Sequence, residues 1–178
     1  RGLAQAAAQD VGFRLDSLVA MKIERQTSRR DADTVFLRDV LSALSGSPVA
    51  AASIEPLGDV SMHTVVRANE PGETDRPTQF QPVSSNYFQV LGIPLRAGRT
   101  FSNGSTDEVV LNETLARMLW PGGDAVGHYL AGEDGTVGRQ VVGIVADAHL
   151  TGLGGVAPMI FEPARSLNYL LFDRSAVA

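Results

Sequence analysis

The side chains that most often do chemistry in proteins are histidines, and this chain has three, His63, His128 and His149. They are far apart in the sequence. None has a second histidine or a carboxylate at a metal-ligand spacing such as H-x-H or H-E-x-x-H. A metal site assembled by the fold stays open as an alternative. The spacing favours surface or hydrogen-bonded histidines, and we predict no metal ligand.

Carboxylates could act in pairs. Two carboxylates do acid–base work when a fold sets them about 5–9 Å apart, and the sequence gives no sign of such a pair. Asp147 lies at the end of a predicted strand, where a carboxylate typically accepts backbone N–H groups of the next turn. The carboxylates that lie nearest the motifs described below are Asp124, Glu133, Asp134 and Asp147.

A third candidate is the glycine-rich segment Gly152-Leu153-Gly154-Gly155. A phosphate loop needs a helix after its glycines, whereas here Pro158 precedes a predicted strand. The sequence has neither a G-x-x-x-x-G-K-[ST] loop nor a G-x-S-x-G elbow. It also has no cysteine, hence no thiolate ligand or nucleophile. We therefore predict no catalytic residue, no cofactor-binding residue and no cofactor.

Two other groups of residues have more than one interpretation. Asn103 and Asn112 head formal glycosylation sequons, but Asn112 lies between a predicted strand and helix, where capping explains it better. Four aromatic residues could line a contact surface, although core or rim packing is the better interpretation of each: Tyr87, Trp120, Tyr129 and Tyr169.

Composition excludes some partners. The 178 residues carry a net charge of −5 with 44% hydrophobic and 20% charged residues, as is ordinary for a globular protein. Arg25, Arg29 and Arg30 are the only basic concentration, which we interpret as a solvated loop, so no nucleic-acid partner is expected. No apolar run reaches the roughly 18–20 residues that span a bilayer.

The elements that must position these residues centre on residues 83–101. Ser84 or Ser85 is placed to cap a helix that begins near Asn86. Gly92 can end that helix in the left-handed conformation, and Pro94 prevents its resumption.

Apolar spacing predicts the remaining elements. Further helices are predicted from Asp33 to Ser45 and from Glu113 to Leu119. Strands are predicted at residues 15–24, 49–54, 63–68, 78–83, 109–111, 128–131, 139–147, 159–162 and 167–173. Whether the first two strands pair directly or with another segment between them is left open.

Three pieces of the chain, in register, resemble the MacB-type periplasmic core domain of FtsX-like ABC transporter permeases. The first is Val83-x-x-x-Tyr87-Phe88-x-x-Leu91-Gly92-Ile93-Pro94-x-x-x-Gly98-Arg99-x-Phe101. The second runs from Val109 through Asn112-Glu113 to Gly127. The third is Val141-Val-Gly143-Ile-Val145-x-Asp147, followed by Gly152-Leu153 and Pro158. Residues 83–163 match well, and residues 12–57 match more loosely.

The resemblance implies an α+β fold with two mixed α/β subdomains. A porter-like strand–helix–strand unit, residues 1–57 plus 165–178, would be split in sequence by a smaller Sabre-like β-rich insert, residues 58–164. In such families a second strand–helix–strand unit follows the insert, and here only its first strand is seen before Ala178, so the porter-like half is expected to be incomplete.

The resemblance also implies a non-catalytic domain on the periplasmic, extracytoplasmic face of a bacterial membrane. It would relay ATP-driven conformational change to substrate efflux or extraction. One membrane-spanning helix is expected before Arg1 and three or more after Ala178. The implied partners are those transmembrane helices, a cytoplasmic ABC ATPase, and a periplasmic adaptor or a second permease copy.

Two further function classes stay open at this point. A free-standing periplasmic ligand-binding module would need a pre-formed pocket with convergent polar groups. A hydrolase would need its carboxylates or histidines brought together by the fold.

Overall fold

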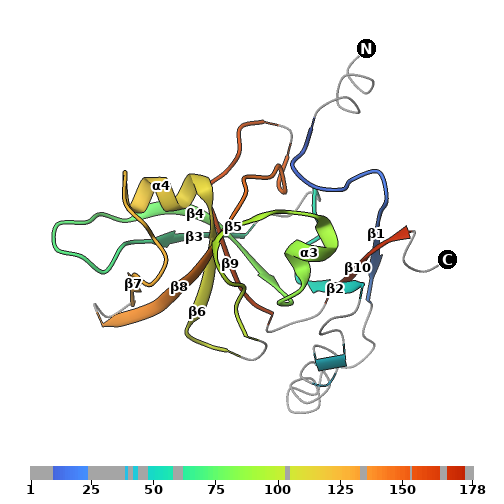
Figure 1. Ribbon diagram of the computed structural model, residues 1–178, viewed down its shortest axis with the longest axis horizontal. Helices are drawn as coiled ribbons and strands as arrows, with labels where there is room; N and C mark the ends of the chain where they lie inside the picture. Colours follow the sequence, from blue (N-terminus) through green and yellow to red (C-terminus); the bar gives the residue numbers. More distant parts are fainter. Residues whose placement is uncertain are drawn as a thin grey trace.

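The computed structural model describes residues 10–23, 39, 42–43, 48–57, 62–102, 105–132, 136–152, 154–164 and 168–174. It is a mixed α/β structure, as predicted, in which strands predominate (Figure 1). Its helices are α3 (Tyr87–Leu91) and α4 (Glu113–Leu119). Its strands are β1 (Leu18–Lys22), β2 (Val49–Ala52), β3 (Met62–Val66), β4 (Arg76–Val83), β5 (Leu95–Gly98), β6 (Glu108–Asn112), β7 (Tyr129–Ala131), β8 (Val137–Val145), β9 (Met159–Pro163) and β10 (Tyr169–Asp173).

The strands form one sheet in the order β1-β10-β2-β4-β9-β6-β8-β5, with β3 on β4 and β7 on β8. The last strand, β10, is antiparallel to both of its neighbours, β1 and β2. The first two strands therefore do not pair directly. Most of the helix predicted from Asp33 to Ser45 lies outside the described residues, although residues 39, 42 and 43 are helical.

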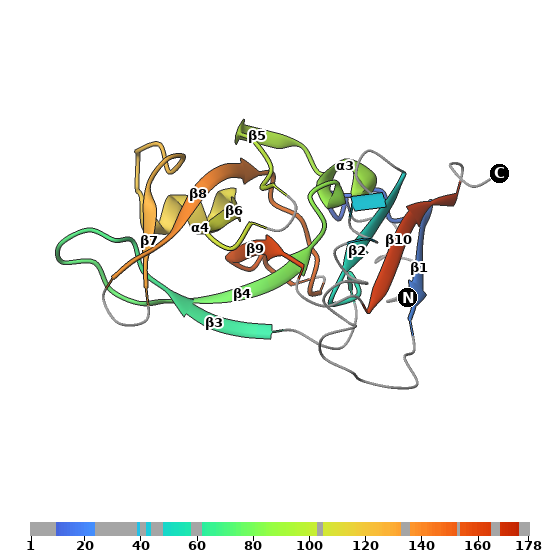
Figure 2. The same ribbon diagram turned by 90° about the horizontal axis from the view of Figure 1, so that it is seen from below.

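The residues that follow β3 pair with β7 and bring the two sides of this sheet together. Ala68 and Leu130 form a bridge. The Ala131 N–H donates to the Arg67 carbonyl, and the Asn69 N–H donates to the Tyr129 carbonyl, both at 2.8 Å. A ring of strands results, β3-β4-β9-β6-β8-β7, which Figure 2 shows with β3 and β4 below β7 and β8.

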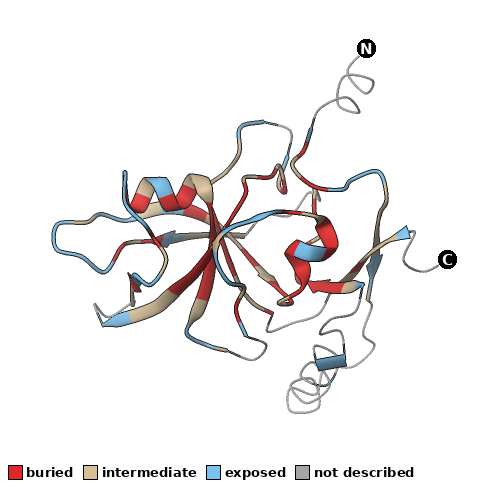
Figure 3. Cartoon of the chain, viewed as in Figure 1, coloured by how far each residue is buried: buried red, intermediate tan, exposed pale blue. Residues whose placement is uncertain are grey.

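Two hydrophobic cores lie on opposite faces of the central strands, because successive side chains of a strand point to opposite faces. In β6, Val109 and Leu111 join the core inside the ring, together with Leu115 and Leu119 of α4. Val110 joins the other core, where α3 packs its Phe88 and Leu91. Figure 3 shows the buried positions concentrated on the inner faces of both helices and along the central strands.

The end of α3 confirms the sequence prediction, whereas its start corrects it. Gly92 ends the helix at φ 73°, in the left-handed region. The predicted cap by Ser84 or Ser85 is wrong: the helix begins after Asn86, and no side chain caps it. The Ser84 hydroxyl instead accepts the Ala51 N–H at 2.8 Å and donates to Asn86 Oδ1 at 2.7 Å. The Ser84 hydroxyl is therefore used in the contact with β2 and does not cap the helix.

Strands β5 and β8 approach closely at a pair of glycines. Gly98 and Gly143 lie opposite each other in the ladder. A Cβ on Gly98 would lie 2.2 Å from the Val142 carbonyl oxygen, and one on Gly143 would lie 2.1 Å from the Arg99 carbonyl oxygen. Since both contacts are to backbone atoms, only glycine fits there. Both residues belong to the stretches that carry the resemblance.

Candidate functional site

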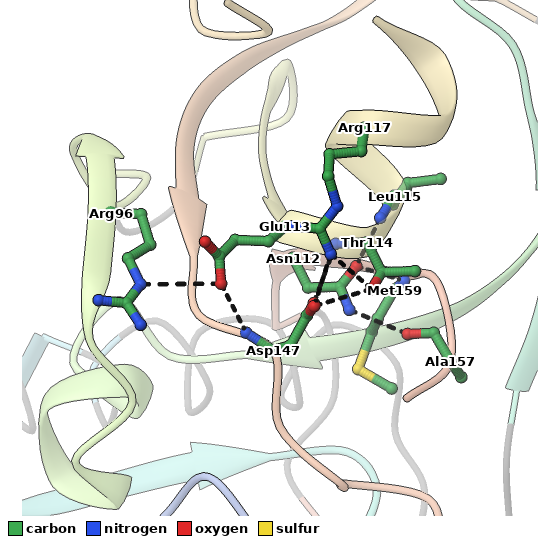
Figure 4. Close-up of polar contacts among 9 residues, drawn as sticks. All are labelled: Arg96, Asn112, Glu113, Thr114, Leu115, Arg117, Asp147, Ala157 and Met159. Atoms are coloured by element: carbon green, nitrogen blue, oxygen red, sulfur yellow. Dashed lines mark hydrogen bonds and ion pairs between the residues drawn. The ribbon is translucent and has the colours of Figure 1, made fainter. Parts of the chain in front are cut away.

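Two stretches of the resemblance meet at the start of α4, where Asn112 is almost completely buried (Figure 4). Its Oδ1 accepts the Leu115 N–H at 3.0 Å, so it caps the helix as the sequence predicted. The same oxygen accepts the Met159 N–H at 2.9 Å. Its amide donates to the Ala157 carbonyl at 2.9 Å. One side chain therefore joins β6, α4 and the segment that enters β9.

Asp147 lies beside this cap, and its role differs from the prediction. Its carboxylate accepts the Thr114 N–H at 2.9 Å and the Thr114 hydroxyl at 2.8 Å. Arg117, one turn further along α4, donates to it at 2.9 Å. The sequence prediction that Asp147 accepts N–H groups of the following turn is wrong, because the carboxylate is held by the Thr114 N–H and hydroxyl at the start of α4 and by Arg117.

Glu113, the first residue of α4, completes the cluster. It accepts the Asp147 N–H at 3.4 Å and lies 3.7 Å from Arg96 of β5. Both carboxylates thus face arginines and backbone donors, as Figure 4 shows. The polar cluster of Asn112, Glu113, Thr114 and Asp147, called the clasp here, fastens α4 to β5, to the segment that enters β9 and to the end of β8.

A second polar cluster, called the junction here, consists of Ser53, Gln81, Ser84 and Asn86, all buried. It lies where β2 and β4 share a single ladder pair, Ala52 with Val83. Two direct backbone bonds flank that pair: the Ser53 N–H donates to the Pro82 carbonyl and the Ser84 N–H to the Ala51 carbonyl.

Side chains supply the remaining bonds of the junction. The Gln81 amide donates to the Ile54 carbonyl at 2.7 Å, and the Asn86 amide donates to the Val49 carbonyl at 2.9 Å. Buried backbone groups must be paired, so these amides replace ladder partners that β2 loses as it diverges from β4. The junction therefore connects β1, β10 and β2 firmly to the rest of the sheet. Sequence reasoning missed it, because polar residues that are distant in sequence give no local signal of their pairing.

The third polar contact lies at the far end of the sheet. Glu70, in the connection between β3 and β4, accepts the Trp120 indole N–H at 2.7 Å and lies 2.9 Å from His128 Nδ1. The Trp120 and His128 rings pack at 5.3 Å. This contact fixes the connection between β3 and β4 against the residues that precede β7.

A fourth contact pins the segment between β5 and β6. Glu108 accepts from the Arg99 guanidinium and, at 2.8 Å, from the Ser102 N–H. The hydrogen bond from Arg99 lowers the pKa of Glu108 to about 2, with the Ser102 bond as the next contribution.

The other residues singled out from the sequence are dispersed. His63 is exposed on β3, whereas the backbone N–H of His149 donates to the Val11 carbonyl. Asp124 accepts the Val126 N–H within its own loop. Among the described residues no three histidines or carboxylates form a group that could hold a metal ion. Glu133, Asp134, Asn103, Leu153 and the arginines at 25, 29 and 30 lie outside the described residues.

The four aromatic residues divide by burial. Tyr87 and Trp120 are buried, and Tyr169 packs against the core that contains α3. Tyr129 of β7 is exposed. The glycine-rich segment leads into strand β9 rather than into a helix. Within the described part of the chain, no helix has the length and apolar character needed to cross a membrane.

Comparison with known proteins identifies the family. Residues 2–177 match the MacB-like periplasmic core domain. The periplasmic region of MacB from Actinobacillus actinomycetemcomitans is similar in structure, with a TM-score of 0.55 and 15% identity over 91% of this chain and 76% of that one. The extracellular domain of the noncanonic ABC-type transporter YknZ from Gram-positive bacteria has a TM-score of 0.50 and 13% identity over 86% of this chain and 81% of that one.

No curated protein sequence matches the chain significantly. The family match spans nearly the whole chain and agrees with the mixed α/β fold. The chain therefore belongs to the MacB-like periplasmic core domain family, the non-catalytic periplasmic or extracellular domains of membrane ABC transporter permeases.

Proposed function

We propose that this domain is a rigid lever that relays ATP-driven movement of a permease's transmembrane helices to the extracytoplasmic side. The observation that carries the proposal is the single hydrogen-bonded sheet that runs through the described structure. The first and last described strands, β1 and β10, pair along their whole length at one end of it. The two connections to the membrane would then both transmit force to the end of the sheet that β1 and β10 form.

The far end of the lever is the connection between β3 and β4 together with β7 and β8, on the opposite side of Figure 2 from β1 and β10. Between the two ends, the junction lies where the sheet narrows to a single ladder pair, and the clasp attaches α4 to the sheet. A satisfied, buried polar network resists bending, because any opening leaves polar groups unpaired. Displacement at β1 and β10 would therefore reach the far end undiminished.

The proposed partners follow from this role. A cytoplasmic ABC ATPase would hydrolyse ATP and move the transmembrane helices. A periplasmic adaptor or a second permease copy would receive the movement, in the efflux or the extraction of a substrate.

Deletion within the full-length permease tests the proposal. Residues 10–174 are replaced by a flexible linker, and ATP hydrolysis and transport are measured in the same membranes. The expected result is loss of ATP-coupled transport with ATPase activity retained. Unaffected transport would overturn the proposal and would favour a separate ligand-binding module.

A further inference from the structure

The segment that precedes β1, residues 10–14, is called the strap here, and Figure 1 shows it in blue ahead of β1. It belongs to no strand, yet it is packed against the fold. Val11 is only 4% exposed and Phe13 only 9%, and both side chains lie in the core that contains α3. Because burial of apolar surface is favourable, these two side chains anchor the strap.

Two backbone hydrogen bonds fix the strap to two different parts of the fold. The His149 N–H, in the segment that follows β8, donates to the Val11 carbonyl at 2.8 Å. The Arg14 N–H donates to the Leu91 carbonyl at 2.8 Å, at the end of α3. The strap therefore bridges α3 and the segment between β8 and β9.

The strap meets the clasp at Gly12. A Cβ on Gly12 would lie 2.7 Å from the Asp147 carbonyl oxygen and 3.0 Å from the Ala148 Cα, so the two backbones are in direct contact. The side chain of the same Asp147 accepts the Thr114 N–H and hydroxyl at the start of α4. Asp147 therefore contacts the strap through its backbone and α4 through its side chain.

The strap can open while the sheet stays closed. A turn in which the Leu18 N–H donates to the Leu15 carbonyl at 3.2 Å separates the strap from β1. The Ser17 hydroxyl donates to the Asp173 carboxylate at 2.7 Å and fastens the start of β1 to β10. Opening of the strap breaks its two backbone bonds and exposes its two apolar side chains, but it breaks no ladder bond between β1 and β10. Segments with so few bonds open at a smaller free energy than the fold as a whole.

We propose that the strap is a releasable anchor that couples the chain before β1 to the clasp. In the docked state the strap supports the backbone at Asp147, so movement of the preceding chain reaches α4 as well as β1. In the released state β1 receives the movement without the clasp, and the hold of Asp147 on Thr114 weakens. The inference rests on the lever function proposed above for what the chain transmits, whereas its test measures only the opening of the strap.

Amide hydrogen exchange of the 178-residue chain, followed residue by residue by NMR, tests the proposal. The amides of His149, Arg14 and Thr114 are expected to exchange at least about tenfold faster than the amides that bond β6 to β8. Exchange at His149 as slow as in β6 would overturn the proposal, because the strap would then open only when the whole fold opens. Loss of transport on deletion of the domain could still be observed in that case.

Two matched variants separate release of the strap from unfolding of the sheet. Val11 and Val110 are buried in the same core, the first on the strap and the second on β6. Val11→Ala removes an anchor, so exchange at His149, Arg14 and Thr114 should accelerate about tenfold. Val110→Ala destabilises the sheet and leaves the anchors of the strap in place. The same three amides should then keep their wild-type rates, while the amides of β6 accelerate.

Two outcomes of this comparison would overturn the proposal. Equal acceleration at His149 by both variants would show that the strap has no opening of its own. Acceleration by Val11→Ala at His149 and Arg14 without Thr114 would show that the strap opens without affecting the clasp. If Val11→Ala does not fold, the wild-type rates decide: exchange at Thr114 as slow as in β6 would overturn the coupling.

Discussion

Replacing Gly98 by alanine tests whether the close approach of β5 and β8 is a fixed feature of the fold. Gly98 has φ 70°, which costs a non-glycine residue about 1 kcal/mol. In addition, its new Cβ would lie 2.2 Å from the Val142 carbonyl oxygen. Because that atom is backbone, relief requires the strands to separate, with loss of the Arg99 N–H bond to the same carbonyl. We expect about 3 kcal/mol of destabilisation in total.

Gly122→Ala is the matched control. Gly122 has φ 77°, nearly the same as Gly98, but nothing lies within 4 Å of the Cβ position. It should lose only the conformational term of about 1 kcal/mol. The free energy of unfolding of both variants is measured by urea denaturation. Equal losses would refute the reasoning, because the contact with β8 would then contribute nothing.

Three further predictions concern single polar groups. Asn112→Ala removes three hydrogen bonds and should cost about 3 kcal/mol in urea denaturation, and a cost below about 1 kcal/mol would contradict the clasp. Burial raises the pKa of Tyr87 far above its ordinary value, and its hydroxyl has no hydrogen-bond partner among the described residues. Tyr87→Phe should therefore leave stability unchanged or raise it by about 1 kcal/mol, and a clear loss of thermal stability would count against this. Glu108 stabilises the fold fully above its unfolded pKa, and this part is lost as the pH falls from about 4.5 toward about 2. In Glu108→Gln the unfolding free energy should lose about 1 kcal/mol less between these two pH values than in the wild type. The effect is small because exposure of Arg99 to solvent weakens the ion pair. An unchanged profile of unfolding free energy against pH would disprove this prediction.

Local features of the fold could be predicted because their causes are local. The end of α3 depends on Gly92 and Pro94, and the start of α4 depends on Asn112 and its neighbours. Both of these helix boundaries can therefore be predicted from residue types and spacing. The capping role of Asn112 was predicted for the same reason.

Long-range features escaped prediction. Nothing in the sequence near Tyr169 shows that β10 inserts between β1 and β2, because strand pairing is set by the whole sheet. The sequence predicts nearby N–H partners for Asp147 and Ser84, but the backbone N–H groups that their side chains accept lie more than 30 residues away, at Thr114 and Ala51. A polar side chain next to a turn or helix start looks locally useful, and only the fold shows which donors reach it.

The division into residues 1–57 plus 165–178 and residues 58–164 remains a prediction. The single pair between β2 and β4 lies near the proposed boundary, yet the sheet and the junction continue across it. Separate unfolding transitions for the two parts, seen by hydrogen exchange, would support two subdomains. One cooperative transition would support a single unit.

The measurement that tests the central claim most directly is a pair of distances in the full-length permease with its ATPase. The domain has no cysteine, so spin labels can be placed at Asp16→Cys, before β1, and at Thr74→Cys, in the exposed connection before β4. A rigid lever predicts the same narrow distance between these labels with and without trapped nucleotide, while the distance from Thr74→Cys to a label in a transmembrane helix changes. A change within the domain, or no movement relative to the membrane, would contradict the account.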